Sequence, residues 1–116
     1  MKNFALFGAG RIGRIHAANI AAHAGARLKY VVDVDAAAAA AIARSAGGEV
    51  ADTQAVLADP GVDALLVASP TDTHADLIEA GSRAGKAILC EKPVDLDVAR
   101  ARAAVAAAER AGILLA

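Results

Sequence analysis

The residues that decide how this chain folds are Gly8-Ala9-Gly10-Arg11-Ile12-Gly13, which directly follow a short apolar run. This pattern is typical of a buried strand that turns tightly into a helix around a bound diphosphate. Gly8 is predicted to permit the turn, Gly10 to let the main chain approach a pyrophosphate, and Gly13 to let the helix pack close to the strand. The alternative is an ordinary glycine-bearing turn from strand to helix.

An acidic residue follows at the distance that such a loop requires. Asp33 lies 20 residues beyond Gly13, at the end of a second apolar run. A carboxylate there accepts hydrogen bonds from the adenosine ribose and repels the 2′-phosphate of NADP. NAD is therefore the predicted cofactor and NADP is less favoured, since neither Val34 nor Asp35 is an arginine. The alternative for Asp33 is a solvated acid at the end of a strand. For Arg11, inside the loop, the sequence leaves open whether the side chain contacts a phosphate or lies in water.

Short apolar runs alternate with longer helical stretches along the whole chain, which is typical of a doubly wound α/β fold. The runs are apolar enough to be buried on both faces, as parallel strands are. We expect about six strands with helices on both faces of the sheet. The expected strands are 3–7, 27–32, 49–51 (weak), 64–68, 87–90 and 113–115.

Residue chemistry also marks the expected helix ends. Gly25, Gly47, Gly85 and Gly112 each separate a helical stretch from the next strand, as helix-terminating glycines do. Thr73, three residues before Asp76, and Asp95, before a periodic run, are the expected helix starts. The stripes expected to face the sheet are 13, 17, 20, 21 and 24 on the first helix and 98, 101, 105 and 108 on the last, where Arg100 is expected to face water.

Composition narrows the class of protein. A chain of 116 residues fits a single domain, which we predict to be one dinucleotide-binding domain over residues 1–116. A net charge of −1 and 3% aromatic residues provide neither the basic surface nor the stacking surface of a nucleic-acid-binding protein. No stretch has the roughly 20 uninterrupted apolar residues of a membrane span. The single cysteine, Cys90, fits a reducing compartment, so we expect a soluble, cytoplasmic domain.

The remaining notable residues all follow predicted strands. Ser69-Pro70-Thr71 comes after the fourth strand and Glu91-Lys92-Pro93 after the fifth. Ligands of open α/β sheets bind beyond the carboxyl ends of the strands. With the glycine loop and Asp33, these segments form four loops that open on one edge of the sheet. Their convergence supports a binding site more strongly than any one motif does.

Lys92 is the best candidate for chemistry. An ammonium group at this edge could hydrogen-bond a substrate hydroxyl and stabilise the oxyanion that develops as hydride leaves. Glu91 could orient this lysine, and Pro93 restricts its backbone, with a cis peptide bond as one way of fixing its direction. The alternative is that Lys92 and Glu91 are solvated surface residues.

The histidines and the cysteine have less specific signals. His74 opens a helix at the same edge, where a neutral imidazole could approach a nicotinamide; the alternative is a surface group at a helix end. His16 is expected to be a packing or edge residue, and Cys90 an inert core thiol, because a reactive thiol needs an exposed, electropositive setting. No metal site is expected, since the three histidines lack metal-ligand spacing and one cysteine cannot complete a thiolate site.

With these motifs in view, the chain resembles the family of glucose–fructose oxidoreductases and inositol dehydrogenases. The resemblance runs in order through residues 8–17, 33–35, 59–64, 69–74 and 85–93, and spans essentially the whole chain. Its most distinctive element is Glu91-Lys92-Pro93. Residues 70–78 and 90–97 look most like those of inositol 2-dehydrogenases.

The resemblance implies a Rossmann-type sheet and a reaction in which a secondary hydroxyl of a cyclic polyol or sugar, such as myo-inositol, loses hydride to NAD. It implies that Lys92 is catalytic, that Asp33 contacts the ribose and that the glycine loop holds the pyrophosphate. The full set of expected cofactor-binding residues is Gly8, Gly10, Arg11, Ile12, Gly13, Asp33, Ser69, Pro70, Thr71, His74 and Glu91.

The chain also departs from the family pattern. Members carry a second, C-terminal α/β domain that completes the substrate pocket and, in inositol dehydrogenases, supplies an aspartate and a histidine for proton transfer; we expect residues 1–116 to lack it. A general base must lie within hydrogen-bond reach of its proton, so we expect cofactor binding from this chain and little or no turnover. The apolar surface that the second domain would cover suggests a homo-oligomer. The alternatives are a stand-alone, non-catalytic NAD-binding module and a truncated fold unit.

Overall fold

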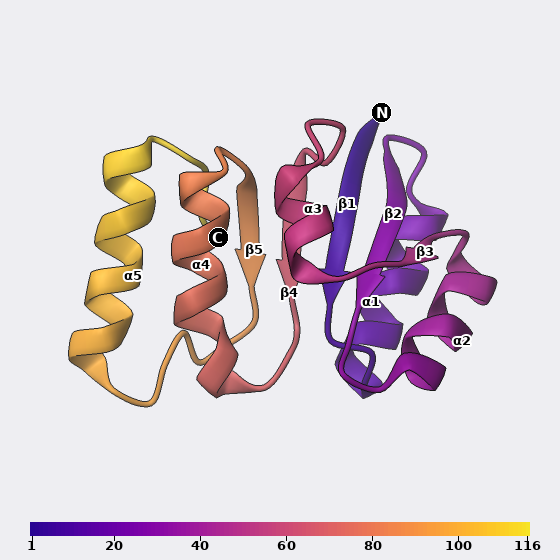
Figure 1. The fold of residues 1–116 in the computed structure, drawn as a ribbon, viewed down its shortest axis with the longest axis horizontal. Coiled ribbons are helices and arrows are strands. Elements are labelled where there is room, and N and C mark those ends of the chain that lie inside the picture. The colour runs from indigo at the N-terminus through magenta and orange to yellow at the C-terminus, as the bar shows by residue number, and fades with distance from the viewer.

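The computed structural model describes residues 1–116 and contains one parallel sheet of five strands in the order β3-β2-β1-β4-β5 (Figure 1). The chain moves outward from β1 to β3 and then returns to the other side of β1 for β4 and β5. In such sheets the ligand crevice lies where the strand order reverses, which here is between β1 and β4. The strands are β1 (Lys2–Phe7), β2 (Ala26–Val32), β3 (Glu49–Val50), β4 (Ala64–Val67) and β5 (Ala87–Cys90).

The predicted sixth strand is present as an isolated bridge. Leu115 pairs with Ile88 of β5 in the parallel sense, and the Ile88 N–H donates to the Leu114 carbonyl over 2.8 Å. The predicted fold class, a doubly wound α/β parallel sheet, is confirmed, with five strands and this bridge in place of about six.

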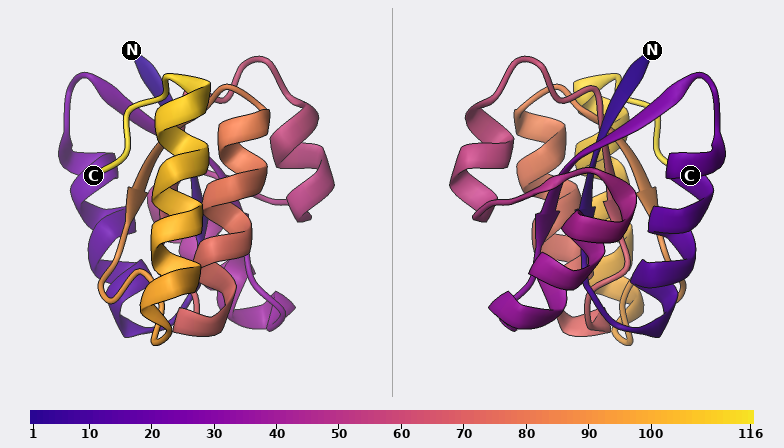
Figure 2. Two further views of the ribbon diagram at one scale, coloured as in Figure 1. Left: turned by 90° about the vertical axis from the view of Figure 1, so that its left-hand side faces the viewer. Right: turned by 90° about the vertical axis from the view of Figure 1, so that its right-hand side faces the viewer.

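Helices cover both faces of the sheet, as predicted. α1 (Arg11–Ala22) and α2 (Ala36–Ala46) pack on one face, and α3 (Thr53–Ala58), α4 (His74–Arg83) and α5 (Val98–Ala111) lie on the other. A 3₁₀ turn, η1 (Thr71–Thr73), precedes α4. The side views show α1 and α4 on opposite sides of the sheet (Figure 2). Because side chains alternate along a strand, Leu6 and Phe7 of β1 enter separate cores on the two faces.

Of the two predicted helix starts, Asp95 is wrong, and Thr73 is confirmed as the N-cap residue of α4 but makes no side-chain cap. The N-terminal cap of α5 is Asp97, whose carboxylate accepts the Ala99 N–H; Asp95 instead accepts the N–H of Asp97 and shapes the turn before the helix. Thr73 does not cap α4 with its side chain, because its hydroxyl donates to the Pro70 carbonyl over 2.6 Å. Both side chains bond to backbone groups of the turn before the helix and therefore do not accept the first N–H groups of the helix.

Three of the four predicted helix-ending glycines are confirmed. Gly47 and Gly112 cap α2 and α5 in the left-handed conformation, and Gly85 follows the last residues of α4 with φ +72°. The prediction for Gly25 is wrong, because α1 ends at Ala22 and His23 caps it in an extended conformation. The region after α1 therefore forms a longer turn than expected.

The predicted apolar stripes are partly correct. On α1, Gly13, Ala17 and Ile20 are buried, whereas Ala21 is exposed within the helix and Ala24 is exposed beyond its end. On α5 the buried residues are Ala104 and Ala108, while position 98 is 63% exposed. The buried face of α5 is therefore turned relative to the prediction.

Arg100 was predicted to face water, but it is bonded to two carboxylates. Its guanidinium bonds to Glu79 and, over 2.6 Å, to Asp76, and both carboxylates belong to α4. These contacts join α5 to α4, the helix that lies next to it on the same face (Figure 1). No helix of the chain combines the length and the apolar character of a membrane-spanning segment.

Candidate functional site

The glycine loop between β1 and α1 is shaped by close backbone contacts. Gly8 has φ +105°, and a Cβ atom there would lie 2.4 Å from the Ala68 carbonyl oxygen. A Cβ on Gly13 would lie 1.9 Å from the Gly8 carbonyl oxygen. The roles predicted for Gly8 in the turn and for Gly13 in helix packing are therefore confirmed.

Gly10 differs from these two glycines. A Cβ on Gly10 would meet nothing within 4 Å, so the chain itself does not require a glycine at this position. The open space in front of the Gly10 backbone is where a diphosphate needs access to the loop. The loop thus fits a dinucleotide, with Gly10 as the residue whose missing side chain leaves room for it.

The N-terminus of α1 offers hydrogen-bond donors to this space. Gly10 is the N-cap residue and makes no side-chain cap, and the first turn contains no acidic residue. The amides of Arg11, Ile12 and Gly13 have no acceptor within the helix, because the first N–H groups of an α-helix have none. Such amides, at the positive end of a helix dipole, favour a phosphate group.

Asp33 lies beside the glycine loop, at the end of β2. Its Oδ2 accepts the Ala9 N–H over 2.6 Å and its Oδ1 accepts the Asp35 N–H over 2.7 Å. Asp35 is engaged elsewhere, since its carboxylate caps α2 through the Ala38 N–H. Each oxygen of Asp33 can accept further hydrogen bonds, so the carboxylate can bind a ribose diol while it fixes the loop.

A pocket opens beside Asp33 and reaches across the switch point to the loop after β4. Its lining includes Gly8, Asp33, Val34, Ser69, Pro70 and Thr73. The Ser69 and Thr73 hydroxyls lie 2.7 Å apart and fix this loop against η1. Thr71 begins η1 and is half-buried. Of the predicted residues, Gly8 after β1, Asp33 after β2, and Ser69 and Pro70 after β4 therefore lie around one crevice.

Lys92 follows β5 at the same edge of the sheet. Its side chain is exposed and takes part in none of the chain's four ion pairs. The Lys92–Pro93 peptide bond is cis, which is the backbone arrangement that the sequence raised as an option. The ammonium group is thus free to meet a ligand from solution.

Glu91 is held by His16, for which only a packing or edge role was expected from the sequence. His16 Nε2 lies 2.7 Å from Glu91 Oε1. This hydrogen bond holds the pKa of the Glu91 carboxyl below its ordinary value, against the opposing effect of burial. The Glu91 N–H donates to the Val67 carbonyl of β4 over 2.9 Å. Nothing in the sequence pattern pairs His16 with a residue 75 positions away.

His74 is buried, with 2% of its surface exposed, so the alternative of a surface group is wrong. Its Nδ1 lies 2.7 Å from the Pro93 carbonyl oxygen, and its Nε2 lies 2.8 Å from the Ser69 carbonyl oxygen. Both ring nitrogens are therefore engaged within the protein. The two ring nitrogens face main-chain carbonyls of the loops after β4 and β5, so neither nitrogen faces the opening of the crevice.

Cys90 ends β5 and is half-buried. Burial, followed by the negative charge of Glu91, raises the pKa of its thiol to about 11. A thiol that stays protonated is a poor nucleophile, in agreement with the predicted inert role. No cluster of three or more His, Cys, Asp or Glu side chains has the arrangement of metal ligands.

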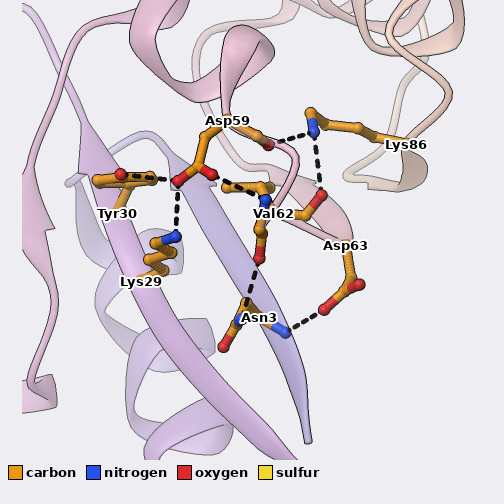
Figure 3. A network of polar contacts seen from close by, with 8 residues as sticks. Asn3, Lys29, Tyr30, Asp59, Val62, Asp63 and Lys86 are labelled. Carbon is orange, nitrogen blue, oxygen red and sulfur yellow. Dashed lines mark hydrogen bonds and ion pairs between the residues drawn. The ribbon is translucent and has the colours of Figure 1, made fainter.

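A polar network that the sequence did not reveal lies at the opposite edge of the sheet (Figure 3). Asp59 Oδ2 lies 2.6 Å from the Lys29 Nζ and accepts the Tyr30 hydroxyl over 2.8 Å, and Oδ1 accepts the Gly61 N–H. These contacts, led by Lys29, lower the pKa of Asp59 to about 2. The neighbours Lys29 and Tyr30 reach the same carboxylate because the strand register shifts at Lys29.

Lys86 completes this network from a buried position, with 5% of its surface exposed. Its Nζ donates to the carbonyls of Asp59 and Val62 over 2.8 and 3.0 Å (Figure 3). The lysine thus closes the turn that leads into β4. Lys29 and Tyr30 lie within β2, and the other members lie before β4 and β5, so no part of the network lies in the loops that follow the strands.

The comparisons agree with this geometry. Residues 2–116 match the family model described as "Oxidoreductase family, NAD-binding Rossmann fold". The chain is 55% identical over 100 residues to inositol 2-dehydrogenase of Rhizobium meliloti, which covers 86% of this chain and 30% of that protein.

Two solved structures are similar over nearly the whole chain. The myo-inositol dehydrogenase of Corynebacterium glutamicum matches with a TM-score of 0.89 at 38% identity, over 99% of this chain and 35% of that one. The scyllo-inositol dehydrogenase of Lactobacillus casei, solved with NAD(H) and scyllo-inositol, matches with a TM-score of 0.90 at 28% identity, over 100% of this chain and 35% of that one. The chain spans about a third of the length of these relatives. It belongs to the oxidoreductase family with the NAD-binding Rossmann fold.

Proposed function

We propose that this chain is the dinucleotide-binding domain of an oxidoreductase that transfers hydride from a secondary hydroxyl of a cyclic polyol or sugar to NAD. The observation that carries the proposal is that the glycine loop, Asp33 and Lys92 follow the carboxyl ends of β1, β2 and β5, at the same edge of one parallel sheet. The names of the similar proteins, which are inositol dehydrogenases, support the substrate class.

Each group has a distinct task in this proposal. The amides of Arg11, Ile12 and Gly13 bind the diphosphate, and Asp33 accepts the ribose hydroxyls. NAD, when bound, supplies the hydride acceptor. Lys92 hydrogen-bonds the reacting hydroxyl of the substrate and stabilises the negative charge that develops on its oxygen.

The first experiment is a fluorescence titration of the chain with NADH and with NADPH. We expect NADH to bind more tightly, because the Asp33 carboxylate repels a 2′-phosphate. Lys92→Ala should leave the NADH affinity unchanged, since the lysine is assigned to the substrate; Lys2→Ala, at the opposite edge, is the matched control. Failure of the chain to bind either cofactor would remove the proposal.

The second experiment adds the separately expressed C-terminal part of a related inositol dehydrogenase and follows the oxidation of myo-inositol. Turnover that Lys92→Ala abolishes would support an enzyme domain. A non-catalytic NAD-binding module, the second candidate, predicts NADH binding without turnover in this assay. Turnover that survives Lys92→Ala would show that another group performs the role assigned to Lys92.

We also propose that the chain associates with a second copy through the apolar surface at β5 and the C-terminal residues. Leu89 is 41% exposed and Leu114 is 73% exposed, and both line a depression that holds none of the predicted site residues. Light scattering after gel filtration should show a dimer that Leu89→Ser with Leu114→Ser dissociates; a monomeric wild-type chain would contradict this.

We propose the cytoplasm as the compartment of the protein, which the free thiol of Cys90 supports.

A further inference from the structure

We propose that His16 and His74 position Lys92 by holding its two neighbours, Glu91 and Pro93, from opposite faces of the sheet. The inference rests on the proposed catalytic role of Lys92 and adds the residues that fix its backbone. His16 belongs to α1, and His74 belongs to α4, on the other face. Neither histidine needs to touch a substrate to act in this way.

The contact from α4 is the more buried of the two. His74 Nδ1 lies 2.7 Å from the Pro93 carbonyl oxygen, and Nε2 lies 2.8 Å from the Ser69 carbonyl oxygen. Neither of these carbonyls accepts a backbone N–H. The N–H of an imidazole donates to one such carbonyl in each tautomer, and the buried ring packs between both, so a single side chain contacts the loop after β4 and the loop after β5.

The contact from α1 reaches the other side of Lys92. His16 Nε2 bonds to Glu91 Oε1 over 2.7 Å, and the Glu91 N–H is fixed to the Val67 carbonyl of β4 over 2.9 Å. His16 lies one turn after the glycine loop on the same helix. The segment that carries Lys92 is therefore connected to the helix whose N-terminus faces the diphosphate site.

Lys92 itself needs such support. Its side chain is long and exposed and forms no ion pair. A catalytic group has to be held near its productive geometry by neighbours that are themselves locked in place. Here only the backbone of Lys92 can provide this, and it is flanked directly by the two residues that the histidines hold.

The test is native-state amide hydrogen exchange, followed by NMR without cofactor. His74→Leu should accelerate exchange of the Glu91 amide about tenfold or more, because the buried polar contacts of the ring with the two loops are lost. His16→Ala should do the same to a smaller degree, as its contact is more exposed. Exchange of the core amides of Leu6 and Leu65 should change far less, and the Lys92 cross-peak should move in both variants.

Two further variants separate positioning from folding. His74→Asn retains a donor near the position of Nδ1, and His74→Gln retains one near Nε2, so each should restore part of the Glu91 protection. His23→Gln, at the far end of α1, is the matched control and should behave like the wild type. If His74→Leu fails to fold, the Asn and Gln variants still report on the two contacts separately.

Two results would overturn the inference. Glu91 exchange that is unchanged in all His16 and His74 variants would show that the contacts do not hold the segment. Acceleration of the Leu6 and Leu65 amides to the same extent as Glu91 would show a purely global effect on stability. A wild-type chain that binds no NADH would instead contradict the proposed function, and the exchange rates would be measured independently of that result.

Discussion

The carboxylate of Asp33 accepts the main-chain N–H of Ala9 over 2.6 Å, so the end of β2 is bonded directly to the glycine loop after β1. The same carboxylate accepts the Asp35 N–H over 2.7 Å. Asp33 therefore shapes the loop as well as offering oxygen atoms to a ribose. Its substitution should affect the diphosphate site and the ribose site together.

Asp33→Asn should weaken NADH binding about tenfold or more, since hydrogen bonds to a charged group contribute about 1.5–3 kcal/mol. It should weaken NADPH binding less, because the charge that repels the 2′-phosphate is removed. Fluorescence titration with both cofactors measures the change, and Glu109→Gln, an exposed acid on α5, is the control. An unchanged ratio of the two affinities would contradict the role of Asp33 in cofactor selection.

The glycines of the loop should respond to alanine in opposite ways. Gly13→Ala should lower the free energy of unfolding by about 3 kcal/mol or more, as in severe overpacking, because its Cβ would lie 1.9 Å from the Gly8 carbonyl oxygen. Gly10→Ala meets nothing within 4 Å, so its stability should stay close to that of the wild type.

Gly10→Ala should affect cofactor binding even though it leaves the stability of the chain unchanged. Gly10→Ala should lower the NADH affinity of a normally folded chain, because the new methyl group occupies the approach of the diphosphate. Urea unfolding and NADH titration of the same samples separate the two effects. A Gly10→Ala variant that binds NADH like the wild type would show that the diphosphate does not approach this residue.

The fold and the place of the site could be predicted because both depend on local patterns. The apolar runs, the glycine spacing and the acid at Asp33 each act within a short stretch of chain, and the parallel order then brings the loops to one edge. The predictions that failed involve competition between local contacts. Asp95 and Thr73 have side chains that can cap a helix, but both bond within the preceding turns, so Asp97 caps α5 and Thr73 begins α4 without a side-chain cap.

The contacts that could not be predicted join residues that are far apart in the sequence. His16 meets Glu91 across 75 positions, and Lys86 meets Asp59 across 27. The burial of His74 depends on its contacts with two loops, at Ser69 and at Pro93, that are distant from each other in the sequence. A single sequence carries no periodicity or spacing for such pairs, since they follow from the tertiary packing.

Cys90 should be slow to react with a disulfide reagent in the folded chain. Burial is the main cause that raises the pKa of its thiol from 9.0 to about 11, with Glu91 second. Near pH 8 this lowers the thiolate fraction about a hundredfold, and the thiolate is the reactive form. The rate should therefore rise about a hundredfold in urea, as measured with a chromogenic thiol reagent.

Glu91→Gln provides the control for the Cys90 prediction. Because burial is the larger cause of the shift, this variant should keep most of the slow reaction in the folded chain. A native rate equal to that in urea would contradict the buried, protonated thiol. A rate that Glu91→Gln raises to the unfolded value would assign the effect to charge instead of burial.

The Asp59 network should make the stability of the chain depend on pH in the acidic range. The pKa of this carboxyl is lowered from 3.8 to about 2, with Lys29 as the largest cause. A lowered pKa means that the folded chain binds fewer protons than the unfolded chain between these values. The contribution of Asp59 is therefore complete above the unfolded pKa and is lost as the pH falls toward about 2.

Asp59→Asn should flatten this part of the pH profile, as measured by urea unfolding at several pH values across that window. Lys29→Met should remove more of the pH dependence than Tyr30→Phe, because the contact with Lys29 has the larger effect on the carboxyl. NADH binding at neutral pH should be unaffected by Tyr30→Phe, since the network lies at the edge away from the glycine loop. An Asp59→Asn variant with the same acidic slope as the wild type would show that other carboxylates control acid unfolding.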